Sequence, residues 1–328
     1  MTRSDWYYRL REHRATLSAA AIFVLLFALY IGKHQVGWTT PVLTTAANKG
    51  VLLAIVAMAQ TLVVLTGGID LSVGMVFVLA NCVASHLVIG TPLQTAMGVV
   101  AVLLTGTLCG LVNGVIIVFG RLQPIITTLA TGIVYYGLAL GLRPVPGGNV
   151  QADLADALTE ALPGGIPAML AVLLAVVVLI WIPYRRSTLG RSALAIGSSE
   201  AATYMSGVSI GRTKIVTYTL AGLLASIGGL LLTFVTFSGE ASSAIGSVYT
   251  LNSIAAVVIG GTVLSGGAGS AIGSIFGAFA LRTIGDLLFV FDLEPLWQPL
   301  FQGIVLLTAV SFGAVRLLGV RNRLDLYR

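Results

Sequence analysis

Long apolar stretches follow one another along almost the whole chain, and this pattern limits its fold more than any other sequence feature. A helix of about 20 apolar residues crosses a bilayer, which is the length scale of these stretches. Only 9% of the 328 residues are charged, whereas a soluble domain has about a quarter of its residues charged. A water-soluble globular protein, a disordered chain, a disulfide-stapled secreted fold and a nucleic-acid binder are therefore excluded. We predict an all-α polytopic membrane protein, with residues 1–328 forming one transmembrane domain in the lipid bilayer.

The sequence predicts about ten transmembrane helices, bounded by charges or turn residues. Their expected positions are 15–32, 50–66, 71–90, 93–119, 124–142, 166–184, 214–237, 250–264, 270–291 and 297–315. Basic residues precede the first stretch, as in a signal peptide, but no small-residue cleavage site follows it. We therefore expect an uncleaved first helix.

The distribution of Lys and Arg predicts that both termini are cytoplasmic. With the N-terminus inside, the inner segments contain Arg3, Arg9, Arg11, Arg14, Arg121, Arg185, Arg186, Arg191, Arg212, Lys214, Arg316, Arg321, Arg323 and Arg328. The outer segments contain Lys33, Lys49 and Arg143, and Arg282 falls inside a span. Such a bias follows the positive-inside rule.

An internal repeat indicates broken helices. The pattern GG-x-x-L-S-x-G starts at Gly67 and again at Gly260, in repeat segments expected near 45–142 and 214–315. Each copy ends an apolar stretch that looks short for a full crossing, and paired Gly-interrupted segments are typical of a substrate path. The candidate hinge or gating glycines are Gly67, Gly68, Gly260, Gly261, Gly266 and Gly267. The span count implies a parallel repeat, which one miscounted half-helix would invert, and close helix packing is the alternative role for these glycines.

Polar residues at membrane depth are the candidate path. Asp70 is costly there unless it is paired, hydrogen-bonded or wet, and it could line a path or, with Ser72 nearby, cap the next helix. Asn113 and Asn252 bring amide groups that suit a polyol but can also join helices. Arg282 and Asp286 stand at i, i+4, where an intramembrane ion pair is favoured over a proton relay.

Two loops are candidates for partner contacts. The outer segment 143–165 can hold a short helix over 152–162 and is either a periplasmic landing place or a solvated loop. The inner segment 185–213 lies between two spans.

The three lysines include none in a P-loop, so any ATP is hydrolysed by another subunit. Cys82 and Cys109 lie in apolar stretches, and the sequence shows no metal-binding spacing.

The chain resembles the membrane permease subunit of bacterial ABC sugar importers, the ribose, xylose, galactose and galactofuranose group that is related to branched-chain amino-acid permeases. The matching stretches include TLVVLTGGIDLSVG at 61–74, GLVNGVIIVFGRLQPIITTLATG at 110–132, GRSALAIGSSEAATYMSGVSIGRTK at 190–214 and LNSIAAVVIGGTVLSGGAGSAIGSIFGAF at 251–279. The chain departs from the group at Ser198 and Ser199, where Gly-Asn is usual, and at Thr250, where an acidic residue is usual. These departures put a simple transfer of sugar identity in doubt.

The resemblance implies a non-enzymatic subunit of the bacterial inner membrane that imports a monosaccharide by alternating access. The expected partners are ATP-binding subunits that carry ATP and Mg, a periplasmic sugar-binding protein and a second permease. A homodimer is favoured because twofold closure is the commonest assembly, and a heterodimer stays open. No cofactor is expected in this chain. The coupling residues toward the ATPase would be Ser199, Glu200, Ala201, Ala202 and Gly207, and the substrate path would include Asp70, Ser72, Asn113 and Asn252. An amino-acid or nucleoside permease, an ion-coupled carrier and a membrane scaffold are the alternatives.

Overall fold

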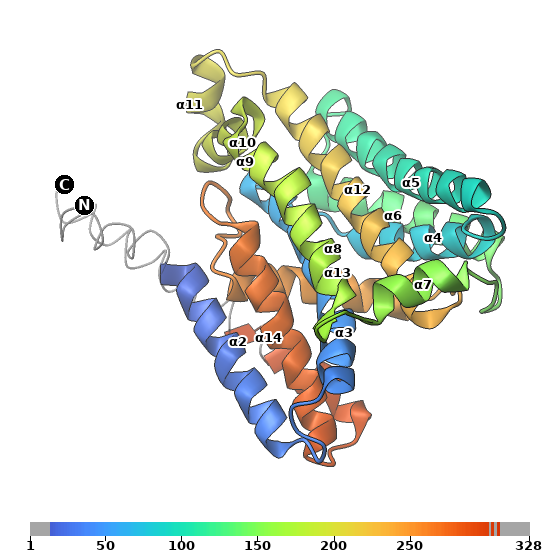
Figure 1. Cartoon of the computed structure of the whole chain (residues 1–328). Coiled ribbons are helices and arrows are strands. Elements are labelled where there is room, and N and C mark those ends of the chain that lie inside the picture. The colour runs from blue at the N-terminus through green and yellow to red at the C-terminus, as the bar shows by residue number, and fades with distance from the viewer. Residues whose placement is uncertain (1–13, 302, 305–306, 309–328) are drawn as a thin grey trace.

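The computed structural model describes residues 14–301, 303–304 and 307–308, and most of this part of the chain is helical (Figure 1). The longer helices are α2 (Arg14–Lys33), α3 (Thr40–Leu65), α4 (Val73–Leu87), α5 (Pro92–Phe119), α6 (Pro124–Leu142), α12 (Ile210–Thr236), α13 (Ser243–Ile259) and α14 (Ala271–Val290). The shorter ones are α7 (Ala152–Thr159), α8 (Ala168–Val176), α9 (Ile182–Arg186), α10 (Thr188–Ser198), α11 (Glu200–Met205) and a 3₁₀ turn at Pro295–Trp297. A π-helical turn at Val177–Trp181 joins α8 to α9, so Ala168–Arg186 forms one continuous span.

Proline and capping residues set the starts of several helices. Pro41, Pro92 and Pro124 stand in the first turn of α3, α5 and α6, where a missing N–H costs little because the first N–H groups of a helix have no partner within it. Thr91 and Gln94 form a capping box at the start of α5. The starts of α5 and α6 therefore fall within one residue of the starts of the expected spans 93–119 and 124–142.

Seven helices in the described part of the chain are long and apolar enough to cross a membrane. The expected spans 71–90 and 250–264 correspond to the shorter helices α4 and α13. The last expected span, 297–315, extends beyond the described residues. The predicted all-α polytopic class is thus confirmed, and the count of ten is not.

The start of helix α3 differs most from its predicted position. The helix begins at Thr40, well before the expected span 50–66, and encloses Lys49, which the sequence analysis assigned to an outer loop. The charge of Lys49 is compensated inside the bundle by Asp286 of α14, so it does not mark a helix end. At 1.5 Å per residue, α3 is roughly 39 Å long. The expectation of a short half-crossing before Gly67 is therefore wrong.

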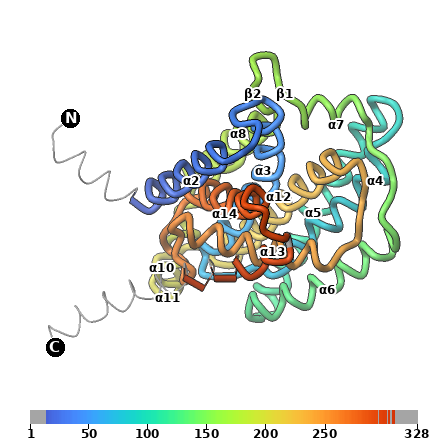
Figure 2. The backbone as a smooth tube through the Cα atoms, turned by 90° about the horizontal axis from the view of Figure 1, so that it is seen from below, coloured from blue at the N-terminus to red at the C-terminus, as the bar shows by residue number. Residues whose placement is uncertain are grey.

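The helix α3 also lies at the centre of the bundle. Inside the bundle 89% of its most apolar stretch is buried, against 11% for α2. The helix α12 packs against α3, α4 and α5, and α14 packs against α2 and α3. Figure 2 shows α2 and α14 on one side of α3 and α4 and α5 on the other. Large side chains of α5 and α6, such as Leu104 and Ile133, are exposed on the outside, as a lipid-facing surface requires.

The segment 143–165 contains α7 within the helix expected over 152–162. A two-stranded hairpin follows, β1 (Ala161–Leu162) paired with β2 (Ile166–Pro167), which the all-α prediction did not include. Because this segment precedes the span Ala168–Arg186 and α10 follows it, the hairpin and α10 lie at opposite ends of that span (Figure 1).

Asn81 of α4 ties two segments together at the end of the bundle near the 143–165 segment. Its Nδ2 donates to Thr233 Oγ1 at 2.9 Å and to the carbonyl of Ser238 at 3.0 Å, and its Oδ1 accepts from the backbone N–H of Glu240 at 2.8 Å. The side chain is buried. Asn81 therefore serves as helix glue, one of the two roles that the sequence left open for intramembrane amides.

We expect Asn81→Ala to lower the free energy of unfolding by about 1–3 kcal/mol, because the partly buried hydrogen bonds from the Asn81 side chain to the backbone of Ser238 and Glu240 are lost. Thermal unfolding of the purified protein in detergent measures this loss. Asn149→Ala is the matched control, since Asn149 is exposed. Equal unfolding temperatures for the two variants would contradict the assigned role of Asn81.

Candidate functional site

The break between α3 and α4, residues 66–72, is closed by hydrogen bonds to buried side chains. Asp70 Oδ1 accepts from the backbone N–H of Ser72 at 2.8 Å and from its Oγ at 2.6 Å. The amide of Gln60, oriented so that both of its groups are satisfied, donates to Asp70 O at 3.0 Å and accepts from Asp70 N at 3.2 Å. Because backbone groups at membrane depth need partners within the protein, these bonds allow the helix to break there.

Asn113 connects this break to α5 and α6. Its Nδ2 donates to Ser72 Oγ at 2.8 Å, and its Oδ1 accepts from Thr131 Oγ1 at 2.7 Å and from the Tyr135 hydroxyl at 3.0 Å. The Tyr135 hydroxyl lies a further 2.9 Å from the carbonyl of Cys109. Asp70, Ser72 and Asn113 are at most 3% exposed. The structure thus brings three of the four predicted path residues into one buried network.

The network lies at the depth of the middle of α6. A Cβ atom at Gly132, midway along that helix, would be 3.3 Å from the Cα of Ser72. The chain therefore breaks beside the middle of the neighbouring helix α6.

The second glycine-rich break, residues 260–270, touches the first. The backbone N–H of Gly267 donates to the carbonyl of Leu65 at 3.2 Å, and the Cα of Gly67 is 2.9 Å from where a Cβ at Gly266 would stand. Positive φ occurs at the first glycine of one pair, Gly67 (φ 79°), but at the second of the other, Gly261 (φ 81°). The two copies of the motif therefore have different backbone conformations.

Gly197 of α10 fills the remaining side of this contact. A Cβ atom there would overlap the backbone nitrogen of Gly267 and the carbonyl oxygen of Leu65. The 197 position thus has no room for a side chain, and α10 sits against both breaks at once. We call the meeting of Leu65, Gly67, Gly197, Gly266 and Gly267 the three-way junction. The sequence analysis did not select Gly197, because one glycine in a helical segment carries no signal of its neighbours.

The predicted coupling residues lie on and around α11, beside α10. Glu200, Ala201 and Ala202 are exposed, and so are Ser199 before them and Gly207 after the helix. Ser199 caps α11 by accepting from the backbone N–H of Ala202 at 3.3 Å. Both carboxylate oxygens of Glu200 contact Lys214 Nζ, at 3.0 and 2.9 Å, which attaches α11 to the first turns of α12.

The predicted pair Arg282 and Asp286 forms part of a larger charged group. Arg282 Nη2 lies 3.9 Å from Asp286 Oδ1, and Lys49 Nζ lies 3.5 Å from the same oxygen. Lys49 does not stand out as a member of this group in the sequence, because a single lysine beside an apolar stretch is typical of a loop. Asn252, the fourth predicted path residue, belongs to this region: it lines a small cavity of about 40 Å³ together with Lys49 and Arg282.

The chain matches, over residues 42–310, the family described as the permease component of the branched-chain amino acid transport system. The Ribose import permease protein RbsC of Escherichia coli (strain K12) is 36% identical over 261 residues, which cover 78% of this chain and 80% of that protein. No solved structure matches the chain significantly.

Two further relatives carry names of other sugars. The Fructose import permease protein FrcC of Rhizobium meliloti is 31% identical over 279 residues, which cover 82% of this chain and 76% of that protein. The Galactose/methyl galactoside import permease protein MglC of Escherichia coli (strain K12) is 27% identical over 313 residues, which cover 90% and 93% of the two chains. The family match and these relatives span most of the sequence, and the chain therefore belongs to the family of permease components of branched-chain amino acid transport systems, with sugar import permeases among its relatives.

Proposed function

We propose that this chain is the membrane-spanning permease subunit of an ATP-driven ABC importer that carries a monosaccharide from the periplasm to the cytoplasm. The observation that carries the proposal is the relationship, over about four fifths of the chain, to permeases named for ribose and fructose. The chain has no P-loop, so ATP and Mg act on a separate ATP-binding subunit. The import cycle is one of alternating access in the bacterial inner membrane.

The family description also leaves an amino acid as a second candidate substrate. A sugar is favoured because three relatives at 27–36% identity are named for sugars. An uptake panel with D-ribose, D-fructose, D-galactose and L-leucine separates the two.

The proposed orientation has both termini in the cytoplasm, as the distribution of Lys and Arg favours. The segment 185–213 then faces the cytoplasm, and 143–165 faces the periplasm and a sugar-binding protein. A second permease completes the membrane part, with a homodimer favoured over a heterodimer because twofold closure is the commonest assembly.

The geometry around α10 supports a coupling role for 185–213. The exposed side chains of Tyr204 and Met205 give α11 an apolar surface for an ATP-binding subunit. Behind that surface, Gly197 contacts both helix breaks. A movement of the ATP-binding subunits that displaced α10 would therefore act on residues 66–72 and 260–270 together.

The substrate path proposed at Asp70, Ser72 and Asn113 opens when the break between α3 and α4 rearranges. In the conformation described here hydrogen bonds between these residues close it. The same hydroxyl and amide groups, once separated, would offer donors and acceptors to a sugar.

Purification of the chain from native membranes in mild detergent is expected to recover an ATP-binding subunit and a periplasmic binding protein, both identifiable by mass spectrometry. The reconstituted complex is expected to accumulate a monosaccharide only when ATP is present. Uptake that survives ATP depletion and stops with an uncoupler would contradict the proposal in favour of an ion-coupled carrier.

We expect Gly197→Ala to uncouple ATP hydrolysis from transport, because its methyl group overlaps both breaks. Overpacking costs about 1–3 kcal/mol, enough to change a conformational population by about 5–150-fold. Sugar uptake per ATP hydrolysed measures the effect in the assembled complex. Gly137→Ala is the control, since nothing lies within 4 Å of its Cβ position. Wild-type uptake per ATP in the Gly197 variant would refute this role.

We expect Ser72→Cys to react with a small aqueous thiol reagent in at least one nucleotide state of the complex and to be protected in the others. Accessibility measured with and without ATP tests this. Cys82 and Cys109 provide an internal background, because both are buried. A cysteine at 72 that stays unreactive in every state would remove this residue from the path.

A further inference from the structure

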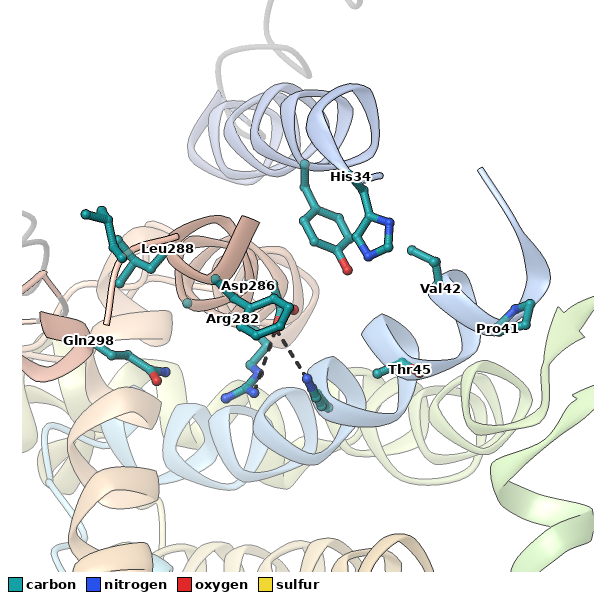
Figure 3. A pocket seen from close by; sticks show the side chains of 13 residues that line it. His34, Pro41, Val42, Thr45, Arg282, Asp286, Leu288 and Gln298 are labelled. Carbon is teal, nitrogen blue, oxygen red and sulfur yellow. Dashed lines mark ion pairs between the residues drawn. The ribbon is translucent and has the colours of Figure 1, made fainter. Parts of the chain in front are cut away.

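A polar cavity lies apart from the helix break. It has a volume of about 400 Å³ between the end of α2, the first half of α3 and the second half of α14, within the range of small-molecule sites. Its polar lining includes His34, Thr45, Lys49, Arg282, Asp286 and Gln298. Figure 3 shows Arg282 and Asp286 of α14 facing α3, with Thr45 on one side and Gln298 on the other.

The ion-pair contacts between the charged side chains of this cavity are long. The contacts of Asp286 Oδ1 with Lys49 and Arg282 measure 3.5 and 3.9 Å, whereas a charge-assisted hydrogen bond measures about 2.7–2.9 Å. Within the described residues, Arg282 Nε is buried and has no hydrogen-bond partner. The side chain of Lys49 is 41% exposed. The donors of Lys49 and Arg282 and the acceptor Asp286 thus lie close together, and their mutual contacts leave hydrogen-bonding capacity for a ligand.

The composition of the cavity decides which ligand it suits. Asp286 accepts hydrogen bonds and repels anions, while Lys49 and Arg282 donate and repel cations. A neutral ligand with several hydroxyl groups can donate to the carboxylate and accept from the two cations without changing the charge of the group. Gln298 adds an amide that both donates and accepts, and the small cavity that adjoins Lys49, Arg282 and Gln298 adds the amide of Asn252.

We propose that the cavity lined by Lys49, Arg282, Asp286 and Gln298 is a binding site for a neutral polyhydroxyl ligand, namely the transported sugar. This inference rests on the proposed function for the identity of the ligand. The sequence predicts separate roles for the Arg282–Asp286 ion pair and for Asn252 in the substrate path. In this proposal both belong to one sugar-binding region.

The site and the three-way junction occupy two ends of one helix. Lys49 and Leu65 both belong to α3 and are separated by roughly 24 Å at 1.5 Å per residue. In the proposed orientation the cavity lies in the outer half of the membrane, where the sugar arrives, and the junction lies toward the ATP-binding subunits. The sugar would thus contact this site before it meets the break.

Cysteine protection in the complete reconstituted complex tests the site. Thr45→Cys introduces a thiol in the cavity lining, and Val36→Cys introduces one on the exposed turn at the same end, outside the cavity. The probes are D-ribose, D-fructose, D-galactose and L-leucine. We expect the sugar that the wild-type complex imports to slow labelling at position 45 by about three- to tenfold, the effect of one or two hydrogen bonds, and to leave position 36 unchanged.

Unchanged labelling at position 45 with every sugar, in every nucleotide state, would overturn the inference. Protection by L-leucine alone would overturn the assignment to a polyhydroxyl ligand. The uptake panel on the wild type separates the two proposals. If the complex imports none of the three sugars, the proposed function is contradicted. If it imports a sugar that does not protect position 45, only the assignment of the cavity is contradicted.

A second variant leaves the charged group intact. Gln298→Leu removes an amide from the cavity without unpairing Lys49, Arg282 or Asp286. We expect it to reduce sugar uptake about three- to tenfold at unchanged ATP hydrolysis and unchanged complex assembly. Gln35→Leu is the control, since Gln35 lies on the exposed turn and does not line the cavity. Equal uptake by the two variants would contradict a sugar contact at Gln298.

Discussion

The satisfaction of backbone hydrogen bonds inside the bilayer is the constraint on which the rest of this structure depends. A helix can stop within the membrane only if other groups of the protein replace its missing partners. At the first break these groups are Gln60 and Asp70, which bind the backbone of residues 70 and 72. Asn113 then fixes Ser72 to α5 and α6. The polar residues of this region therefore shape the chain first, and any contact with a solute requires that arrangement to loosen.

A long helix joins the functional regions that we propose. The central helix α3 carries Lys49 in its first half and Leu65 at its end. Protein interiors transmit displacement because their packed side chains leave little empty volume. A change of contacts at the charged cavity would therefore be transmitted through α3 to the contact with Gly197, and the reverse. No intervening loop is needed for this coupling.

The sequence was sufficient for the class of fold and for most spans, because apolar length and proline or capping signals are local. It predicted the start of α6 at Pro124 correctly. It failed at α3, since a charge marks a helix end only when no partner compensates it, and the partner of Lys49 lies far along the chain at Asp286.

The candidate site was predictable in its residue types but not in its grouping. Asp70, Ser72 and Asn113 meet as expected for polar residues at membrane depth, whereas Asn252 lies with the charged group instead. Gly197 could not have been found, because its importance comes from two backbone segments distant in sequence. The span count depends on α4 and α13, which are shorter than the seven candidate spans, and on the expected span 297–315, which extends beyond the described residues.

The two glycine motifs have different backbone conformations, and this difference limits which residues each motif accepts. Aligned on their first glycines, Val73 of the first copy corresponds to Gly266 of the second. Val73 begins a helix, but Gly266 has φ 89°, a conformation in which a β-branched residue is strongly strained. Transplanting the first octapeptide onto residues 260–267 would force a valine into that conformation. The two motifs share a sequence pattern, but neither can replace the other at its position in the chain.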